Sequence, residues 1–458
     1  MKQIDKDKFS FNYNGKKEIS SISVKSAYFL EHVDVKIPGS KSFTNRATVL
    51  AAMTGCEIIL TGFLFSEDTY WGLFSIQEFG FQVLIDYENF CVKILPPKIF
   101  TIQKFNLFLG KAGTLARFFP ALILNWNKIF LNSLPITVTL DAHEQLKKRP
   151  LSDLIYALKK LGANILVYTL PLTITSSDLK GECEISGRQS SQFLSGLLLA
   201  AAGSKNTINI HRRDNLVQPD YVKMTIESIH SFHGEVSYNE ELTEFSTYNP
   251  NGLNASKYEI EADASSLCYF ITLAFLHNFN LKIKNIGSNS LQPDYKFIEI
   301  LKLMGANICS TPNETIVSKI SGERLIKGGL KLDFTLLSDQ ALTIGVIALF
   351  ANAPIEVYGI EHIRQHESDR ISCFVKNLNS LNLKVEEKND GFIIFPADNI
   401  SSLCGCWETW HDHRFVMSGF ILASFAHRIE INNPSCVEKT WPNFFNDVEK
   451  LGFHLRIT

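Results

Sequence analysis

The feature of this sequence that most restricts its fold is an internal sixfold repeat. Each copy contains an amphipathic helix that ends at a tight turn and leads into a short apolar strand. Gly and Asn tolerate the left-handed backbone conformation that ends a helix, so we expect that conformation at each turn. The turns are 70 to 82 residues apart and fall at Gly80, Gly162, Gly234, Gly305, Asn382 and Gly452.

A second set of helices, apolar nearly all round, alternates with the first. Such helices lie inside a domain, and polar residues at their starts cap their N-termini. They read SKSFTNRATVLAAM, GTLARFFPALIL, SSQFLSGLLLAAA, ASSLCYFITLAFL, SDQALTIGVIALFA and HDHRFVMSGFILASFA. The repeat is therefore strand, buried helix, strand, surface helix and two strands. Six copies predict an α/β protein with two similar domains of three βαβαββ repeats, whose buried helices direct their N-termini at one cleft.

Composition narrows the class of ligand. A chain of 458 residues with 45% hydrophobic residues can form two large cores, and its net charge of −2 provides no broad basic field for nucleic acid or an anionic membrane. Anionic ligands must then be held by local groups of cations. The longest apolar runs fall short of the roughly 18 residues of a membrane span, and the first residues lack a signal-peptide core. We expect a cytoplasmic protein.

The cysteines predict neither disulfides nor a metal site. There are nine, an odd number scattered along the chain, which favours reduced thiols. Cys404 and Cys406, followed by His411 and His413, form the one metal-like group. A C-x-C pair lacks the usual spacing of a structural zinc site, and no second cysteine pair stands nearby, so we predict no metal.

The stretch IPGSKSFTNRATVL, Ile37–Leu50, is a candidate anion site. It joins a Pro-Gly break to a helix whose first turn carries Lys41 and Ser42. Free backbone N–H groups and the helix dipole attract phosphate or carboxylate there, and Lys41 adds a mobile charge. Arg46 follows at a spacing that brings it to the same side as Ser42. An ordinary helix start with a solvated Lys is the alternative for these residues alone.

Further candidates stand at the starts of the buried helices and in the loops before the surface helices. Helix capping and dipole pairing are the alternatives for Ser190, Asp339 and Glu367. Arg414 enters an apolar helix and therefore needs an anionic partner. The candidates are Gly113, Arg117, Arg149, Ser190, Ser191, Gln192, Asp339, His366, Glu367, Asp369, Arg370, Asp412, Arg414 and Lys439.

Taken together, these stretches resemble the 3-phosphoshikimate 1-carboxyvinyltransferase family, also called 5-enolpyruvylshikimate-3-phosphate synthases. The resemblance covers nearly the whole chain after about residue 30 and follows the family's order: PGSKSxxNR, LGxAGTxxR, RP before a surface helix, SSQFLxxLL, DASS, HESDR as a variant of KETDR, DHR, and KT before an aromatic residue and Pro. It implies the two-domain enolpyruvyl transferase fold. Residues 1–39 with 262–458 would form one domain, residues 40–261 the other, and the active site would lie in the cleft between them.

The resemblance also implies a reaction. The family transfers the enolpyruvyl group of phosphoenolpyruvate to the 5-hydroxyl of shikimate 3-phosphate by addition and elimination, in the shikimate pathway to chorismate and the aromatic amino acids. It needs no cofactor or metal, and glyphosate is its inhibitor. The partners implied are these two small molecules, without nucleic acid or membrane, and we expect a monomer.

The family's site residues carry over by motif. Glu367 would be the acid that protonates carbon and Asp339 the base at the hydroxyl, with Lys41 and His366 completing the catalytic group. Phosphoenolpyruvate would contact Lys41, Gly113, Arg149, Arg370, Arg414 and Lys439. Shikimate 3-phosphate would contact Lys41, Ser42, Arg46, Ser190, Ser191, Gln192, Asp339 and His366.

Four residues depart from the family's usual pattern. Lys111 replaces an Asn, Phe118 follows Arg117 and replaces a Pro, Gln218 replaces a Ser, and His366 replaces a Lys. Two other functions stay open. One is the sister enzyme UDP-N-acetylglucosamine enolpyruvyl transferase, although its Lys-Asn motif and nucleophilic Cys are absent from the matching places. The other is a repurposed, non-catalytic paralogue that binds an anion.

Overall fold

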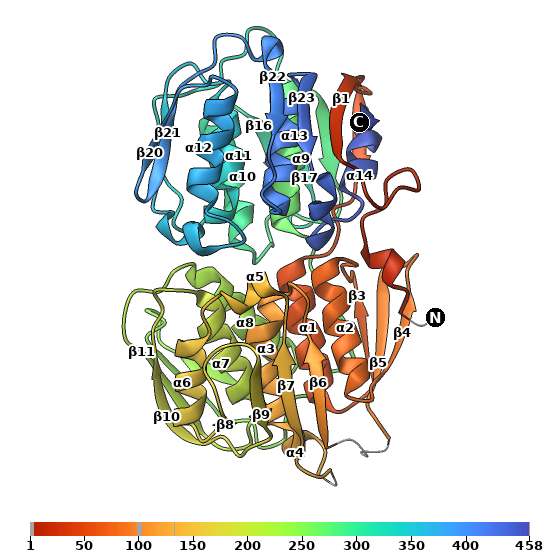
Figure 1. The fold of residues 1–458 in the computed structure, drawn as a ribbon, viewed down its shortest axis with the longest axis vertical. Coiled ribbons are helices and arrows are strands. Elements are labelled where there is room, and N and C mark those ends of the chain that lie inside the picture. The colour runs from red at the N-terminus through yellow and green to blue at the C-terminus, as the bar shows by residue number, and fades with distance from the viewer. Residues whose placement is uncertain (1–3, 99–102, 132, 458) are drawn as a thin grey trace. The chain divides into compact units, whose positions relative to one another are not determined.

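The computed structural model describes residues 4–98, 103–131 and 133–457, and it shows an α/β chain that forms two compact units (Figure 1). Unit 1 consists of the segment that ends at Phe9 together with Gly39–Glu261. Unit 2 consists of Ser10–Pro38 together with the chain from Ala262 onward. The described part of the chain contains no helix with the length and apolar character that a membrane span requires.

Each unit contains four-stranded sheets that share one strand order. In one of them β6 (Lys104–Phe108) pairs in parallel with β7 (Thr137–Asp141), which pairs antiparallel with β9 (Leu172–Thr175), and β9 pairs antiparallel with β8 (Asn164–Ile165). The parallel pair needs a crossover, and a buried helix supplies it. Six sheets of this kind occur in the described residues, so the predicted βαβαββ repeat is confirmed.

Unit 1 holds three of these repeats. The first contains α1 (Lys41–Thr54), β3 (Ile58–Thr61), α2 (Glu67–Glu78), β4 (Gln82–Asp86), β5 (Cys91–Leu95) and β14 (Lys257–Glu259). The second adds α3 (Gly113–Leu124), α4 (Trp126–Ile129), α5 (Glu144–Lys147) and α6 (Ser152–Lys160) to the sheet above. The third contains β10 (Gly181–Ile185), α7 (Ser191–Gly203), β11 (Ile208–Arg212), α8 (Pro219–Ser231), β12 (Val236–Tyr238) and β13 (Glu244–Thr247).

Unit 2 holds the other three, with 3₁₀ helices labelled η. The first contains β2 (His32–Val35), α9 (Ala264–His277), β15 (Asn280–Ile283), η2 (Pro293–Lys296), α10 (Phe297–Leu303), β16 (Asn307–Ser310) and β17 (Thr315–Ser318). The second contains β18 (Lys331–Asp333), η3 (Ser338–Gln340), α11 (Ala341–Ala348), β19 (Ile355–Tyr358), η4 (Glu361–Gln365), α12 (Arg370–Ser380), β20 (Val385–Lys388) and β21 (Gly391–Ile394). The third contains η5 (Ile400–Ser402), β22 (Cys404–Trp407), α13 (His413–Ala423), β23 (Arg428–Asn432), η6 (Pro434–Lys439), α14 (Phe444–Lys450), β24 (Phe453–Ile457) and β1 (Ser21–Ala27).

Three sheets include a strand from a distant part of the chain. β14 pairs in parallel with β3, and β2 pairs in parallel with β15. β1 lies between β23 and β24 and pairs antiparallel with both. The sequence had suggested no role for the first 30 residues, yet β1 completes the last sheet of unit 2.

The second helix set is buried, as predicted. α11 and α13 bury every residue, and α7 buries all of its residues except Gln192. Ser40, Ser190 and Asp412 cap α1, α7 and α13, since each side chain accepts a hydrogen bond from a first-turn backbone N–H. The buried apolar residues form a separate core in each unit.

The helix exits follow the prediction with one exception. Left-handed φ values of 90°, 98°, 108°, 57° and 110° occur at Gly80, Gly162, Gly305, Asn382 and Gly452. The prediction for Gly234 was wrong, because the left-handed residue is His233, with φ of 57°. Gly234 is needed for another reason: a Cβ there would lie 2.6 Å from Ile229 Cγ2 and 2.6 Å from Leu253 Cδ2.

The N-terminal segment also departs from the prediction, which placed all of residues 1–39 in the domain of residues 262–458. η1 (Lys6–Phe9) packs in unit 1, where the Phe9 ring meets Phe65 edge-on with 5.2 Å between centroids. Phe11 and the residues after it belong to unit 2, where the Phe11 N–H donates to Glu438 Oε2 at 3.0 Å. Burial of the Phe9 ring, 1% exposed, explains why η1 belongs to unit 1.

Candidate active site

The start of α1 combines a helix N-terminus with a partly exposed cation. Lys41 is the first helical residue after the Ser40 cap. Its Nζ lies 3.7 Å from Asp68 Oδ2, and Asp68 is buried near the start of α2. Sequence reasoning missed Asp68, because a carboxylate in a first helical turn is an ordinary dipole partner.

Arg46 holds α1 against its neighbours. The guanidinium is buried, and it donates to Thr225 Oγ1 at 2.8 Å, the Ser42 carbonyl at 2.9 Å and the Tyr221 carbonyl at 2.9 Å. Burial lowers the pKa of Arg46 to about 10, so it remains charged at neutral pH. The guanidinium carbon lies 5.1 Å from the ring centroid of Phe118 in α3. This contact accounts for Phe118, one of the departures from the family's pattern.

Two guanidinium groups meet at the first turn of α3. Arg117 donates to the Gly113 carbonyl at 2.6 Å and to the Pro150 carbonyl at 3.2 Å. A Cβ on Gly113 would lie 2.7 Å from Arg149 Nη1 and 2.9 Å from Arg117 Nη1. Gly113 therefore leaves the space that Arg149 and Arg117 occupy.

The start of α7 lies in the same part of unit 1. Ser190 caps the helix, Ser191 is buried, and Arg117 lies over the ring of Phe193 with 5.9 Å between the guanidinium carbon and the centroid. Thr225 Oγ1, which accepts from Arg46, donates to Ser195 Oγ at 2.9 Å. Neither residue was predicted, because Thr225 stands inside a helix without a motif and Ser195 occupies a variable position of the SSQFLxxLL motif.

Arg370 is a buried arginine at the centre of an ion-pair network in unit 2. Its Nε donates to Asp412 Oδ2 at 2.8 Å, its Nη1 to Asp339 Oδ1 at 3.0 Å and its Nη2 to Glu367 Oε2 at 3.0 Å. Burial by itself would lower the pKa of Arg370, but the charges of Asp412, Glu367 and Asp339 together outweigh it and raise the pKa. Asp412 was visible in the sequence only as part of the DHR motif.

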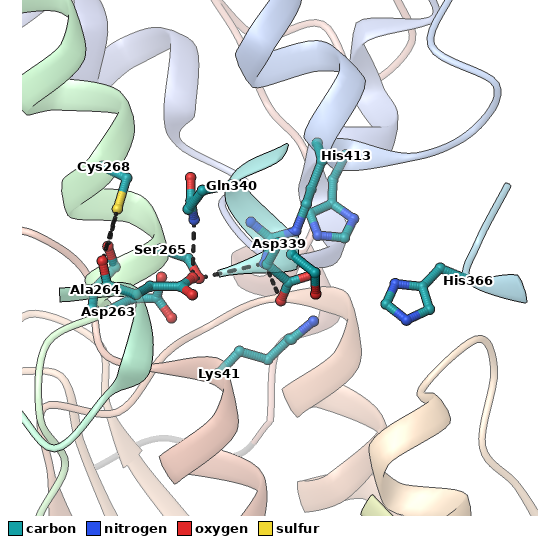
Figure 2. Close-up of polar contacts among 12 residues, drawn as sticks. Lys41, Asp263, Ala264, Ser265, Cys268, Asp339, Gln340, His366 and His413 are labelled. Atoms are coloured by element: carbon teal, nitrogen blue, oxygen red, sulfur yellow. Dashed lines mark hydrogen bonds and ion pairs between the residues drawn. The ribbon is translucent and has the colours of Figure 1, made fainter. Parts of the chain in front are cut away.

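Two further cations extend this network. Lys439 Nζ lies 2.5 Å from Glu367 Oε1, and Arg414 Nη2 lies 2.7 Å from Asp339 Oδ2, as the dashed line at Asp339 in Figure 2 marks. Asp339 is thus the anionic partner that Arg414 was predicted to need. Cations and carboxylates alternate in the order Lys439, Glu367, Arg370, Asp339 and Arg414.

Two histidines border the network. Arg370 Nη1 lies 3.1 Å from His366 Nδ1, and since a guanidinium only donates, Nδ1 is the acceptor and carries no proton. His362 Nε2 lies 2.9 Å from Ser338 Oγ, and burial lowers the pKa of His362. His362 was not among the predicted residues.

The cysteine and histidine group forms no cluster suited to a metal ion. Cys404 and Cys406 are exposed, whereas His413 is buried beside Asp412. Within residues 4–98, 103–131 and 133–457, no group of three or more His, Cys, Asp or Glu side chains is placed to hold a metal ion.

Comparisons with known proteins agree with this architecture. Residues 32–448 match the family model described as EPSP synthase (3-phosphoshikimate 1-carboxyvinyltransferase). The chain is 32% identical over 431 residues to 3-phosphoshikimate 1-carboxyvinyltransferase 2 of Halalkalibacterium halodurans, which covers 92% of each chain. It is 33% identical over 428 residues to 3-phosphoshikimate 1-carboxyvinyltransferase of Shewanella sp. W3-18-1, covering 91% of this chain and 96% of the relative.

Solved structures show the same fold. EPSP synthase from Acinetobacter baumannii superposes with a TM-score of 0.76 at 22% identity, over 96% of this chain and 100% of that chain. The predicted enolpyruvyl transferase fold is therefore confirmed. From the family match over residues 32–448 and these relatives, the chain belongs to the EPSP synthase (3-phosphoshikimate 1-carboxyvinyltransferase) family.

Proposed function

We propose that this protein transfers the enolpyruvyl group of phosphoenolpyruvate to the 5-hydroxyl of shikimate 3-phosphate and releases phosphate, as an enzyme of the shikimate pathway. Membership of the EPSP synthase family supports the reaction. The observation that carries it in this chain is the alternation of buried cations with partly buried carboxylates, in the order Lys439, Glu367, Arg370, Asp339 and Arg414. It holds two carboxylates next to cations that suit a phosphate and a carboxylate.

We assign the proposed binding residues to one or both of the two substrates. Gly113 has no side chain, which gives the Arg149 guanidinium room at the start of α3, where it would bind an anionic ligand. Asp339 and His366 would contact the cyclohexene ring of the acceptor and its hydroxyl groups. For phosphoenolpyruvate we assign Lys41, Gly113, Arg149, Arg370, Arg414 and Lys439. For shikimate 3-phosphate we assign Lys41, Ser42, Arg46, Ser190, Ser191, Gln192, Asp339 and His366.

The proton balance assigns different roles to the two carboxyl groups. In the addition step Glu367 protonates the methylene carbon of phosphoenolpyruvate while the 5-hydroxyl oxygen bonds to the neighbouring carbon and gives its proton to Asp339. In the elimination step Glu367 takes a proton back from the new methyl group, and the carbon–phosphate oxygen bond breaks. Asp339 returns its proton to the phosphate. Each group ends as it began.

The charge of the bound substrate would determine whether Glu367 carries a proton. Its contacts with Lys439 and Arg370 stabilise the carboxylate as an anion. An anionic substrate that binds Lys439 and Arg370 competes with Glu367 for these cations and so favours the protonated acid. Binding of the donor would therefore prepare the acid that the addition step needs.

The substrates are soluble metabolites, so we place the reaction in the cytoplasm. We also expect the protein to be a monomer. The deciding experiment measures phosphate release and the mass of the organic product with both substrates present, and with each omitted. Phosphate release that requires both substrates supports the proposal. Turnover with UDP-N-acetylglucosamine as acceptor would favour the sister reaction, and binding without turnover would favour a repurposed paralogue.

The Arg414→Ala variant tests whether the ion-pair network takes part in the proposed reaction. Removing one charge-assisted contact should lower kcat/KM about tenfold to a hundredfold or more. Arg428→Ala is the matched control, because Arg428 begins β23 at an exposed position and donates to the Ser402 carbonyl. Equal losses in both variants would contradict the assignment of Arg414.

A further inference from the structure

Asp294 is a buried carboxylate that the mechanism above does not use. It lies in η2, within the sequence QPDY at residues 292–295, and is 2% exposed. Its Oδ2 accepts hydrogen bonds from Ser265 Oγ and from Gln340 Nε2, the latter at 2.9 Å, while its Oδ1 has no hydrogen-bond partner among the described residues. Burying a carboxylate costs free energy, so a carboxylate at this buried position needs an explanation.

Both donors are next to residues of the network. Ser265, in the first turn of α9, lies with its Oγ 3.4 Å from Arg414 Nη2, the nitrogen that pairs with Asp339. Gln340 directly follows Asp339 in η3. Figure 2 shows Ser265 and Gln340 on the same side of Asp339. Asp294 therefore closes a ring that runs through Ser265, Arg414, Asp339 and Gln340.

We propose that Asp294 is a positioning residue that orients Arg414 through Ser265 and Asp339 through Gln340. This inference rests on the proposed function, because it concerns how the base and its paired cation are held for the reaction.

The role of the Asp294 carboxylate follows from the direction of its hydrogen bonds with Ser265 and Gln340. An ionised Asp294 only accepts, so the single hydroxyl proton of Ser265 is directed to it, and the Ser265 lone pairs remain for Arg414. The Gln340 amide is fixed in the same way, because its Oε1 accepts from Thr343 Oγ1 at 3.1 Å and leaves Nε2 for Asp294. Both bonds go to Oδ2, so an Asn at position 294 could keep them through its amide oxygen, but it would lack the negative charge that strengthens them.

Charge makes this arrangement pH dependent. Burial and then the charge of Asp339 raise the pKa of Asp294 to about 6, while Arg414 and the two hydrogen bonds lower it. Arg370 beside Asp339, and Asp263, Cys268 and Tyr269 of α9 and its cap, are the other titratable or charged groups nearby. Below about pH 6 the proton would lie on Oδ1, so the two bonds to Oδ2 would lose their charge assistance and weaken, and the ring would loosen.

The pH dependence of stability distinguishes a residue that positions the reacting groups from one that only supports the fold. The pKa of an unfolded Asp is about 3.9, so between about pH 4 and 6 the folded state binds the extra proton. The stabilisation that the neutral Asp294 carboxyl provides is lost as the pH rises through 6. At pH 8 the ionised group destabilises the fold. Asp294→Asn, which removes this charge, should then keep or raise Tm while it lowers activity.

The test compares Asp294→Asn with the parent in kcat, KM for both substrates, Tm at pH 8 and the pH profile of kcat/KM. We expect kcat/KM at pH 8 to fall about tenfold to a hundredfold, an unchanged or higher Tm, and loss of the parent's titration near pH 6. The control is Glu299→Gln, an exposed carboxylate of α10 that pairs with Lys302 and should behave like the parent. Unchanged kinetics at every pH, or a loss of activity that follows a fall in Tm, would overturn the inference.

A second variant leaves Asp294 in place. Ser265→Ala removes the connection to Arg414, so combining it with Asp294→Asn should cost less than the product of the two single losses. Losses that multiply would contradict action through Ser265. An inactive parent overturns the proposed function, whereas an active parent with unaffected variants overturns only the role of Asp294.

Discussion

Glu367 contacts two cations at once, Lys439 Nζ at 2.5 Å and Arg370 Nη2 at 3.0 Å. The same two cations are assigned to the donor substrate, so one side chain would serve both as proton donor and as competitor for the binding groups. Substitution can separate these effects, because an amide keeps the shape of the side chain but carries neither the charge nor the acidic proton.

We predict that Glu367→Gln lowers kcat about a hundredfold to ten-thousandfold, the usual range for loss of a general acid. KM for phosphoenolpyruvate should stay the same or fall, since Gln competes less for Lys439 and Arg370. Steady-state kinetics measure both constants, with Glu356→Gln as control, because the partly exposed Glu356 pairs with Lys331 outside the network. A raised KM with unchanged kcat would make Glu367 a binding residue only.

Gly113→Ala tests the space beside Arg149. A Cβ there would lie 2.7 Å from Arg149 Nη1, so the guanidinium must move. We expect competitive inhibition by glyphosate in the parent and a weaker inhibition in the variant, with the inhibition constant raised more than KM for phosphoenolpyruvate. Gly72→Ala is the control, because a Cβ at this position of α2 would meet Leu115 and Thr48 at an ordinary contact distance of 3.5 Å. Equal inhibition of parent and Gly113→Ala would contradict the assignment of this turn.

His277 makes the stability of unit 2 depend on pH. Its ring stacks on Phe425 with 3.8 Å between centroids, and its Nε2 lies 2.8 Å from Ser424 Oγ. Burial, followed by the charges of Arg324 and His427, lowers the pKa of His277 to about 3. An unfolded His has a pKa of about 6.5, so between about pH 6.5 and 3 only the unfolded state binds the proton. Stability should therefore fall as the pH falls through this range.

We predict that His277→Phe, which keeps a stacking ring but does not titrate, flattens this fall by at most about 1.4 kcal/mol per pH unit. Urea unfolding at pH 4.5, 5.5 and 6.5 gives the slopes, with the exposed His454→Phe as control. Parallel slopes for the parent and His277→Phe would show that another group causes the pH dependence.

At the scale of elements, η1 stands outside the residues that match the family model, 32–448, yet it is packed like a core element. The Phe9 ring meets Phe65, Tyr70 and Tyr87 edge-on, with centroids 5.2, 5.5 and 6.2 Å away. The Asp5 N–H also donates to Tyr87 Oη at 2.7 Å. The aromatic cluster of α2 and the β4–β5 hairpin thus receives its cover from a segment that the family motifs do not include.

Phe9→Ala should lower the free energy of unfolding by about 1.5–3 kcal/mol, the value for burial of one Phe. The larger cost of a cavity is not expected, since a short terminal segment can detach rather than leave a void. Urea unfolding measures the loss, with Phe108→Ala, 43% exposed, as control. Catalysis should persist in both variants. No loss of stability in Phe9→Ala would mean that the packing of η1 contributes nothing.

At the scale of the whole molecule, the buried apolar residues form two separate clusters, one in each unit. Phe119 belongs to the cluster of unit 1 and Phe374 to that of unit 2, and both are fully buried. Each core can therefore be weakened by itself.

Phe374→Ala should destabilise unit 2 by about 3–5 kcal/mol, the usual cost of removing a buried ring. Hydrogen exchange should then accelerate in peptides of unit 2 while peptides of unit 1 keep most of their protection. Phe119→Ala is the reciprocal control, in which unit 1 should lose protection. Loss of protection in both units in either variant would indicate that they unfold as one.

The sequence alone was enough for the repeat, the buried helices, the family and nearly all of the proposed site residues. The repeat and the buried helices follow from local rules: hydrophobic periodicity identifies a buried helix, a polar residue caps it, and Gly or Asn ends it. The family and the roles of the site residues came from the resemblance of the motifs to a known family. The motif residues Lys41, Gly113, Asp339, Arg370 and Arg414 could be named because each stands at a helix start that the pattern locates.

Only the tertiary structure decided which groups become partners. Asp68 beside Lys41, Thr225 beside Arg46 and Asp294 beside Ser265 join residues 27, 179 and 29 positions apart, and no periodicity encodes such pairs. His233 rather than Gly234 takes the left-handed turn, and Gly234 is instead required by its packing against Ile229 and Leu253. Local patterns follow from backbone geometry, whereas partners follow from how whole elements pack, and packing is a property of the complete chain.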